Sequence, residues 1–348
     1  MIYLSNLLNR VLFVLLKLRL FFFKLEFKRQ KRQHVKLSNQ RVAILVDNEP
    51  VDSLSFLSLA KIVQKILIKN GVESKILFVD KKLFQNLKKH NISLVFIGFS
   101  RIYRKEGTIQ ALLDYLDIKY VGSSHLSVAL CFDKSLCKKI SIAQGVKAPK
   151  FLEIRHLKEV NISKVKQELK FPVIVKGNHS YISMGLSYVN DSKSLFLAVE
   201  ECLSFDDSVL IEEYIDGQEV SIGVIGTLDN PKPLGIVCLK KNTVVSFKDK
   251  KMASIEIDYD MKLSEETKLR IINTALTLFK SFGCRGFARF DFIIKKGEVY
   301  FLEVNGIPGL FKESLMTKSA EIAGMSHEDL IMNILVSALG KSDYLSFK

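Results

Sequence analysis

Residues 283–315 read GCRGFARFDFIIKKGEVYFLEVNGIPGLFKESL, and this stretch gives the clearest indication of how the chain folds. Two runs of β-branched and aromatic residues, 289–294 and 298–305, are separated by Lys295-Lys296-Gly297. Such runs favour strands, and a short break that contains glycine is typical of a hairpin. The stretch therefore predicts two antiparallel strands followed by a loop.

Polar side chains interrupt the apolar runs of this hairpin at alternate positions. Because successive side chains of a strand point to opposite faces, Arg289 and Asp291 share one face. Glu303 and Asn305 point together from the partner strand for the same reason. A three-residue loop centred on Gly297 places Asp291 opposite Glu303, whereas a two-residue loop places them on opposite faces.

These polar side chains suit a divalent cation. Mg2+ prefers oxygen ligands in octahedral geometry, commonly one or two carboxylates together with substrate phosphates. Asp291, Glu303 and Asn305 are therefore the predicted ligands of Mg2+ or Mn2+. The alternative is a surface hairpin whose charges form a salt bridge and whose Asn305-Gly306 pair makes a turn.

Three motifs follow one another in this stretch. They are Arg-Phe-Asp-Phe at 289–292, Glu-Val-Asn-Gly-Ile-Pro-Gly-Leu at 303–310 and Glu-Ser-Leu at 313–315. Together they resemble the metal and acceptor segment of ATP-grasp ligases, specifically of the D-alanine–D-alanine ligase family. The resemblance extends over most of residues 41–340.

The composition is that of a globular protein with a large core, because 48% of the 348 residues are hydrophobic. The five cysteines form no CxxC pair and the six histidines form no HExxH motif, so neither a zinc site nor a disulfide framework is indicated. A cytoplasmic location is expected. After the first 40 residues, no interleaving of aromatic and basic residues typical of nucleic-acid-binding modules follows, so we expect no nucleic-acid partner.

The first 40 residues hold a net charge of +8 out of the chain's +15. They are rich in Leu and Phe, but Arg10, Lys17, Lys24 and Lys31 recur at seven-residue spacing. No uncharged run reaches the roughly 18 residues that a spanning helix needs. The pattern predicts an amphipathic helix that contacts the inner face of the membrane through residues 1–32. Packing on the protein itself or on a partner is the alternative, and a homodimer is left open.

The element pattern and the resemblance together predict an α/β protein with an α+β ATP-grasp fold. Strand and helix patterns alternate from Arg41 onward, which argues for a doubly wound parallel sheet. The expected divisions are a basic amphipathic leader (1–40), an N-terminal α/β domain (41–133), a central ATP-grasp lobe (134–235) and a C-terminal ATP-grasp lobe with the metal and acceptor site (236–348).

The resemblance implies an ATP site built from three segments. Lys134 opens a helix, Lys176 ends an apolar strand, and residues 209–219 resemble the nucleotide hinge of the family. The two lysines are expected at the phosphates. The hinge residues are expected to contact the nucleoside: Glu212 the adenine amino group, the backbones of Glu213 and Ile215 the adenine edge, and Glu219 the ribose hydroxyls.

The resemblance also implies the residues that assist catalysis and bind the second substrate. Ser183 remains in a phosphate-covering loop, 177–185, where the family is richer in Gly and Ser. Arg289 and the Gly309 amide are expected to stabilise developing negative charge. Ser314 and Leu315 are expected near the second substrate. A further phosphate-binding lysine is expected among Lys248, Lys250 and Lys251.

The departures from the family pattern gather where the first amino acid would bind. Ser100-Arg101 stands where family members carry His-Gly, and Val51 stands where they carry an acidic residue. Three hypotheses follow. The chain is a D-alanine–D-alanine ligase that serves cell-wall precursor synthesis, an ATP-grasp ligase for another pair of amino-acid or carboxylate substrates, or a membrane-associated ATP-binding protein without catalysis.

Overall fold

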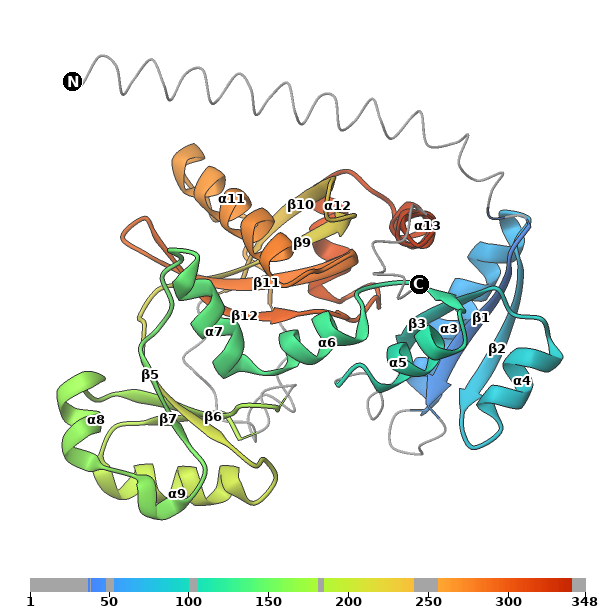
Figure 1. Cartoon of the computed structure of the whole chain (residues 1–348). Coiled ribbons are helices and arrows are strands. Elements are labelled where there is room, and N and C mark those ends of the chain that lie inside the picture. Colours follow the sequence, from blue (N-terminus) through green and yellow to red (C-terminus); the bar gives the residue numbers. More distant parts are fainter. Residues whose placement is uncertain are drawn as a thin grey trace.

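The computed structural model describes residues 37, 39–47, 53–99, 106–180, 185–240 and 256–339 (Figure 1). The predicted leader helix, Ser183 and the lysines at 248, 250 and 251 lie outside these residues, as do Val51 and Ser100-Arg101. Within the described residues, none of the helices combines the length and the apolar character that crossing a membrane requires. The predicted membrane contact therefore stays a prediction.

The N-terminal domain is a parallel sheet in the order β2-β1-β3-β4 (Figure 1). Val42 and Ile44 of β1 pack under α3, whereas Ala43 and Leu45 face α4 and α5 on the other side. Helices on both faces of a parallel sheet confirm the predicted doubly wound domain. The bounds are β1 (Arg41–Asp47), α3 (Ser53–Lys69), β2 (Glu73–Val79), α4 (Leu83–Lys89), β3 (Leu94–Phe99), α5 (Thr108–Tyr115) and β4 (Lys119–Tyr120).

Two helices connect this domain to the rest of the chain. They are α6 (His125–Phe132) and α7 (Lys134–Ala143). The Asp133 side chain accepts a hydrogen bond from the Leu136 backbone at 2.8 Å, which caps the start of α7. Cys131 and Cys137 of these helices pack into the core of the C-terminal sheet. The helices therefore support the C-terminal part of the molecule.

The middle sheet is antiparallel, in the order β5-β8-β6-β7. Its strands alternate: Val173 and Val175 pack under α8 and α9, whereas Lys176 points to the opposite face with Glu212. One face is thus an ordinary apolar core and the other carries buried charges. The bounds are β5 (Phe151–Ile154), η2 (Leu157–Glu159), α8 (Ile162–Glu168), β6 (Val173–Gly177), β7 (Ser187–Val189), α9 (Ser192–Leu203) and β8 (Val209–Glu213).

The C-terminal sheet is antiparallel, in the order β10-β9-β11-β12. Helix α11 covers one face with apolar side chains, and α12 lies close to part of the other face, where a Cβ on Gly223 would come within 2.7 Å of Met316. The predicted boundary between residues 235 and 236 falls inside β10, while the chain changes sheets between β8 and β9. The bounds are β9 (Gln218–Gly226), β10 (Pro231–Cys238), α11 (Glu265–Ser281), β11 (Gly286–Lys295), β12 (Glu298–Asn305), α12 (Leu315–Ile322) and α13 (His327–Ser337).

The hairpin of β11 and β12 reaches the expected register by an unexpected route. Lys295 pairs with Glu298 across a two-residue turn, in which Lys296 and Gly297 have φ values of 51° and 79°. A two-residue turn alone would separate Asp291 and Glu303 onto opposite faces. A register shift next to Asp291 restores the pairing, so that Asp291 lies opposite Glu303. Of the two loop lengths considered, the structure has the two-residue one, and Asp291 and Glu303 nevertheless share a face.

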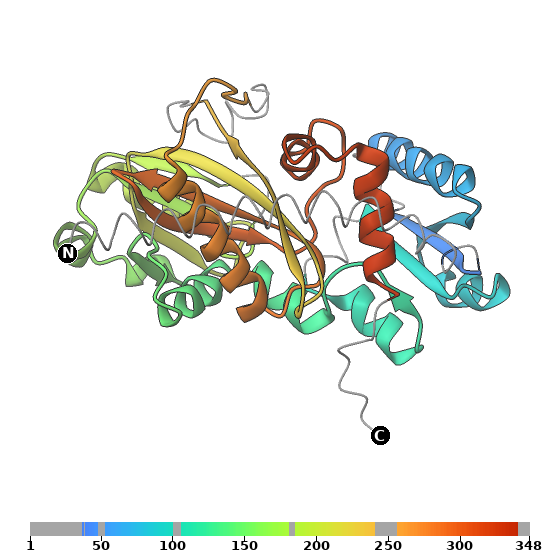
Figure 2. The ribbon, with the colours of Figure 1, turned by 90° about the horizontal axis from the view of Figure 1, so that it is seen from above.

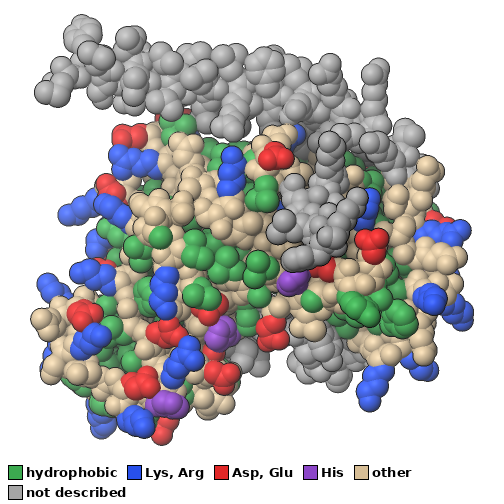
Figure 3. Space-filling model, in the orientation of Figure 1, with side chains coloured by type: hydrophobic (Ala, Val, Ile, Leu, Met, Phe, Trp, Pro, Cys, Tyr) green, Lys and Arg blue, Asp and Glu red, His purple; other side chains and the backbone are tan. Residues whose placement is uncertain are grey.

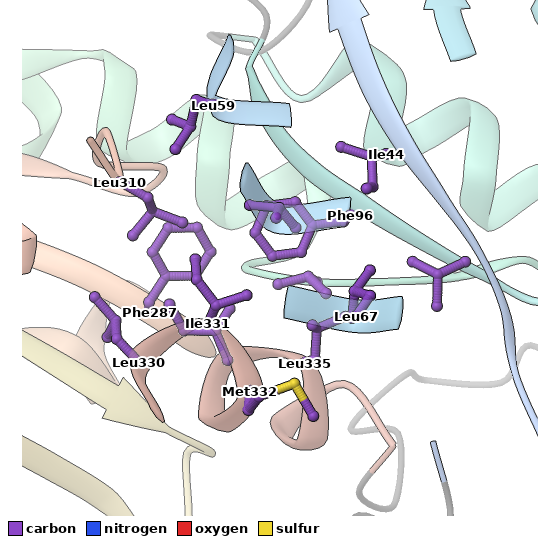
Figure 4. Packing of buried hydrophobic residues seen from close by; sticks show 14 of the residues in the cluster. Ile44, Leu59, Leu67, Phe96, Phe287, Leu310, Leu330, Ile331, Met332 and Leu335 are labelled. Atoms are coloured by element: carbon purple, nitrogen blue, oxygen red, sulfur yellow. The ribbon is translucent and has the colours of Figure 1, made fainter. Parts of the chain in front are cut away.

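The N-terminal domain and the C-terminal sheet share one apolar core. Figure 4 shows Ile44, Leu67 and Phe96 of the N-terminal domain packed with Phe287 and Ile331. From above, α13 lies beside α3 (Figure 2). At the edge of this contact, the Lys69 ammonium lies 2.6 Å from the carboxylate of Glu328 on α13. The N-terminal domain and α13 therefore form one body with the C-terminal sheet.

Basic and acidic side chains are interspersed on the viewed face of the molecule (Figure 3). The described residues of this face include both signs of charge over the middle sheet and the N-terminal domain. Mixed charge of this kind is an ordinary solvated surface. The expectation of no nucleic-acid partner stays a prediction.

Replacement of Leu67 by alanine is expected to destabilise the shared core. Leu67 is fully buried, so its truncation leaves a cavity and should lower the free energy of unfolding by about 2–5 kcal/mol, measured by urea titration. The neighbouring Ile68 is 62% exposed, and Ile68→Ala should change the same quantity by less than about 0.5 kcal/mol. Equal losses in the two variants would contradict the shared core.

Candidate active site

The middle sheet, the C-terminal sheet and α7 lie next to one another in the molecule (Figure 1). A group of charged side chains with low exposure lies between them. The members are buried or partly buried, and the charges of some of them shift the pKa values of Lys176, Arg289 and Glu303. We call this group the charged cluster. Its members are Lys134, Lys138, Lys176, Glu212, Arg289, Asp291 and Glu303.

The C-terminal sheet supplies an arginine bound to an aspartate through two hydrogen bonds. The Arg289 Nε donates to Asp291 Oδ1 at 3.0 Å, and its Nη2 donates to Oδ2 at 2.8 Å. Ser221 of β9, directly opposite in register, also donates to Oδ1. Burial opposes the charge on Arg289, but Asp291, Glu303 and Glu219 outweigh it and raise the pKa of the guanidinium. The pair therefore holds the guanidinium in a fixed plane.

Glu303 is held in its charged form by the lysines around it. Burial acts to raise its pKa, but Lys134, Lys176 and Arg289 outweigh burial and lower it. Within the described ranges, no side chain donates a hydrogen bond to the Glu303 carboxylate. A partly buried carboxylate that is charged and accepts no side-chain hydrogen bond is suited to bind a cation.

Asn305 completes the predicted metal set, although its amide already has one partner. Its Oδ1 accepts a hydrogen bond from the Ile307 backbone NH at 3.2 Å. This contact is the Asn305-Gly306 turn expected if the hairpin were only a surface hairpin. A carbonyl oxygen has two lone pairs, so this contact orients the amide and leaves capacity for a metal. The described residues contain no group of three or more His, Cys, Asp and Glu that could hold a metal. Asp291, Glu303 and Asn305 thus fit Mg2+ only if substrate oxygens complete the shell.

The middle sheet supplies a carboxylate between two lysines. Glu212 Oε2 lies 3.0 Å from the Lys176 ammonium, and Oε1 lies 3.2 Å from the ammonium of Lys138. Burial lowers the pKa of Lys138 to about 8, against the attraction of Glu212. For Lys176, burial also acts to lower the pKa, but Glu212 and Glu303 outweigh it and raise the pKa. Sequence reasoning missed Lys138, although it lies one helical turn from Lys134.

Lys134 lies at the start of α7 against the loop after β6. Its backbone NH donates to the Asn178 carbonyl at 3.3 Å, and its ammonium donates to the Ser180 carbonyl. The Asn178 side chain accepts from the Ser135 backbone at 2.8 Å and donates to Asp133 at 3.1 Å. Burial lowers the pKa of the Lys134 ammonium. The start of the predicted phosphate loop is therefore fixed to the helix that carries the predicted phosphate lysine.

His179 is a second residue that sequence reasoning missed. Its Nδ1 lies 3.2 Å from Asp206 Oδ1, and its Nε2 lies 3.4 Å from Asp133 Oδ2. The hydrogen bond with Asp206, helped by the charge of both aspartates, raises the pKa of His179. The sequence offers no signal for this role, because Asp133 and Asp206 are distant along the chain. His179 joins the phosphate loop to two separate elements.

The other predicted nucleotide residues lie along β8 and β9. Glu213 pairs with Lys150 through the backbone at 2.8 Å, and Ile215 is buried. Glu219 lies near the cluster, because its charge raises the pKa values of Lys176 and Arg289. The structure therefore brings Glu219 together with Lys176, Glu212 and Glu303, as the resemblance implies.

The predicted acceptor residues form a separate group. A Cβ on Gly309 would come within 3.3 Å of the Ser314 hydroxyl, so the two residues lie side by side. Leu315 is buried at the first position of α12. A ring nitrogen of His327 lies 2.8 Å from the Leu310 carbonyl and supports the loop. None of the hydrogen bonds or ion pairs described for Gly309, Ser314 or Leu315 reaches the charged cluster.

Comparison with known proteins identifies relatives over nearly the whole chain. The family described as D-ala D-ala ligase C-terminus matches residues 140–336. The D-alanine–D-alanine ligase of Carboxydothermus hydrogenoformans is 34% identical over 290 residues, 79% of this chain and 90% of that protein. D-alanine–D-alanine ligase A of Bacillus cereus is 29% identical over 303 residues, 87% of this chain and 95% of that protein.

A solved structure has the same arrangement. The D-alanine–D-alanine ligase of Bacillus anthracis complexed with ATP superposes with a TM-score of 0.73 at 27% sequence identity, and the match covers 86% of this chain and 97% of that one. The predicted ATP-grasp fold is confirmed.

Loss of the His179 imidazole is expected to lower the stability of the folded protein more at acidic pH than at basic pH. Because the folded pKa is raised, the charged pairs with Asp206 and Asp133 stabilise fully below the unfolded pKa and are lost as the pH rises through the folded value. In thermal melts, His179→Gln should therefore lower Tm more at about pH 5.5 than at about pH 9.

The exposed His156 provides the matched control. His156→Gln should give melts close to those of the native protein at both pH values. If the effect of His179→Gln on Tm is the same at both pH values, the charged pairs do not contribute as described.

Proposed function

The chain belongs to the D-alanine–D-alanine ligase family and is an ADP-forming ATP-grasp ligase, and from this membership we propose that it joins two molecules of D-alanine through an acyl phosphate. The dipeptide would serve the synthesis of cell-wall precursors. The observation that carries the proposal is the charged cluster: lysines from α7 and β6 meet carboxylates and an arginine from β11 and β12.

We propose that ATP lies between the middle and C-terminal sheets. Lys134 and Lys176 would bind its phosphates, because both ammonium groups lie near the carboxylate that would hold the metal. The Glu212 carboxylate would accept a hydrogen bond from the adenine amino group. The backbones of Glu213 and Ile215 would line the adenine edge, and the Glu219 carboxylate would accept hydrogen bonds from the ribose hydroxyls.

Asp291, Glu303 and Asn305 would hold Mg2+ or Mn2+. The ion would neutralise charge on the transferring phosphate. Arg289 lies two residues before Asp291, on the same face of β11. Its guanidinium is already fixed by the Asp291 carboxylate. An arginine held in this way stabilises developing negative charge with little reorganisation.

The reaction would proceed in two steps. An oxygen of the first substrate's carboxylate bonds to the γ-phosphorus of ATP while the bond to the bridging oxygen breaks, which gives an acyl phosphate and ADP. The amine of the second substrate then attacks the acyl carbon, and phosphate leaves. Arg289 would stabilise negative charge in both steps, and the Gly309 amide would assist in the second.

The acceptor loop would receive the second substrate. Ser314 ends the loop as the N-cap of α12, and its side chain makes no capping hydrogen bond, so its hydroxyl is available for a substrate carboxylate. Leu315 would contact the same substrate from the first turn. Ser183, outside the described residues, stays a predicted catalytic residue, as the homodimer and the inner-membrane location stay predictions.

A different pair of substrates is the second candidate function. The observation that favours it is the loss of the His-Gly pair at Ser100-Arg101 and of an acidic residue at Val51.

Phosphate release in the presence of Mg2+ and ATP tests which substrates are joined. D-alanine is expected to stimulate release, because the family's members are named for this amino acid. L-alanine and a panel of other amino and carboxylic acids serve as controls. Stimulation by a different acid would replace the proposed substrate, and no stimulation by any acid would overturn the ligase proposal.

Glu303→Ala is expected to abolish ADP formation and leave the fold intact. Loss of a group that only supports a metal ligand commonly costs 10–100-fold, so loss of a ligand should lower kcat more than about 100-fold. Glu298→Ala on the same strand is the control, because Glu298 pairs with Lys147 and Arg270 at the hairpin end. Near-native ADP release by Glu303→Ala would refute the metal role.

A further inference from the structure

Helix α7 buries a polar stripe. Lys134, Lys138 and Ser141 recur at helical spacing and are at most 9% exposed. The neighbouring Lys139 instead has 56% of its side chain exposed and pairs with Glu153 at 3.1 Å. A lysine is seldom fully buried unless it is paired, because its charge must be removed from water. Lys138, which the proposed mechanism does not use, therefore needs an explanation.

Lys138 faces a single carboxylate. Its ammonium lies 3.2 Å from Glu212 Oε1, and no described atom forms a well-directed hydrogen bond with it. The other oxygen, Oε2, lies 3.0 Å from Lys176. Two lysines thus hold one carboxylate, each at its own oxygen. The arrangement fixes the plane of the Glu212 carboxylate.

The two lysines differ in what else attracts them. Lys176 ends β6 directly before the phosphate loop and is also attracted by Glu303 of the metal site. When Lys176 turns toward a phosphate, Glu212 loses one partner. Lys138 is completely buried, and its ammonium lies 3.2 Å from Glu212 Oε1. A buried carboxylate without a counter-charge is unfavourable, so the Lys138 ammonium would compensate the Glu212 carboxylate while nucleotide is bound.

We propose that Lys138 is a positioning residue that orients the Glu212 carboxylate toward the 6-amino group of adenine. In this way Lys138 sets the preference for ATP over purine nucleotides that lack that group. The inference rests on the proposed ATP site. Lys138 itself touches neither the substrates nor the metal residues.

The test replaces Lys138 with methionine, which keeps the bulk of the side chain and removes the charge. Lys138→Met should raise the KM for ATP about tenfold, the loss expected for a hydrogen bond to a charged group, while kcat stays near native. The KM for purine riboside triphosphate, which has no 6-amino group, should not change. Lys139→Met is the matched control and should leave both KM values unchanged.

A double variant shows whether Lys138 acts through Glu212. Glu212→Gln removes the carboxylate charge, so adding Lys138→Met to it should cause little further rise in the KM for ATP. If the two effects multiply, or if Lys138→Met raises the KM values of both nucleotides equally, the inference is wrong. If neither nucleotide supports turnover in the native protein, the proposed function itself fails.

The native protein supplies an independent measurement should Lys138→Met not fold. The charged groups that face Lys138 are Glu212 on β8, Lys176 on β6 and Glu303 on β12. Burial lowers the pKa of Lys138 to about 8, so the ammonium loses its proton as the pH rises through this value. The KM for ATP, divided by the KM for purine riboside triphosphate, should rise across that range. A ratio that stays constant would overturn the inference.

Discussion

The rest of the active site depends on the compensation of charges buried between two sheets. Lys138 and Lys176 hold Glu212, and Arg289 holds Asp291. The attraction within each pair offsets only part of the free energy that is lost when the two charges are removed from water. Such pairs therefore contribute little to stability. Their value lies in a fixed array of charge that the protein maintains before any substrate arrives. Phosphoryl transfer depends on such an array, because it needs mainly positioning and neutralisation.

The fold produces this array by giving the middle sheet and the C-terminal sheet one apolar face each and charged side chains on the opposite face. Helices α8 and α9 cover the apolar face of the middle sheet, and α11 covers that of the C-terminal sheet. The opposite faces, which carry the charged side chains, then face each other and α7. The register shift beside Asp291 is essential here, because without it Asp291 and Glu303 would point to opposite faces. The shared core of α3 and α13 supports the acceptor loop, since Leu310 is part of it.

Much of this arrangement could be predicted from local pattern. The alternation of β1 with α3 predicted the parallel sheet, and the motifs around Asp291 and Glu303 predicted the family. Other features could not be predicted in this way. The change of sheet between β8 and β9 is one of them, because β9 precedes residue 236 but pairs with β11. His179 was missed, because its partners Asp133 and Asp206 come from distant segments.

The sequence by itself determined which residues carry charge, which runs become strands and which faces are apolar, because these depend on side-chain chemistry and on periods of two or about 3.6 residues. Only the tertiary structure decided which charges meet. Lys138 and Lys139 are adjacent in the sequence and have the same side chain. In the structure Lys138 is buried against Glu212, whereas Lys139 is exposed to water. The difference arises because burial depends on how α7 packs between sheets that are far apart in the sequence.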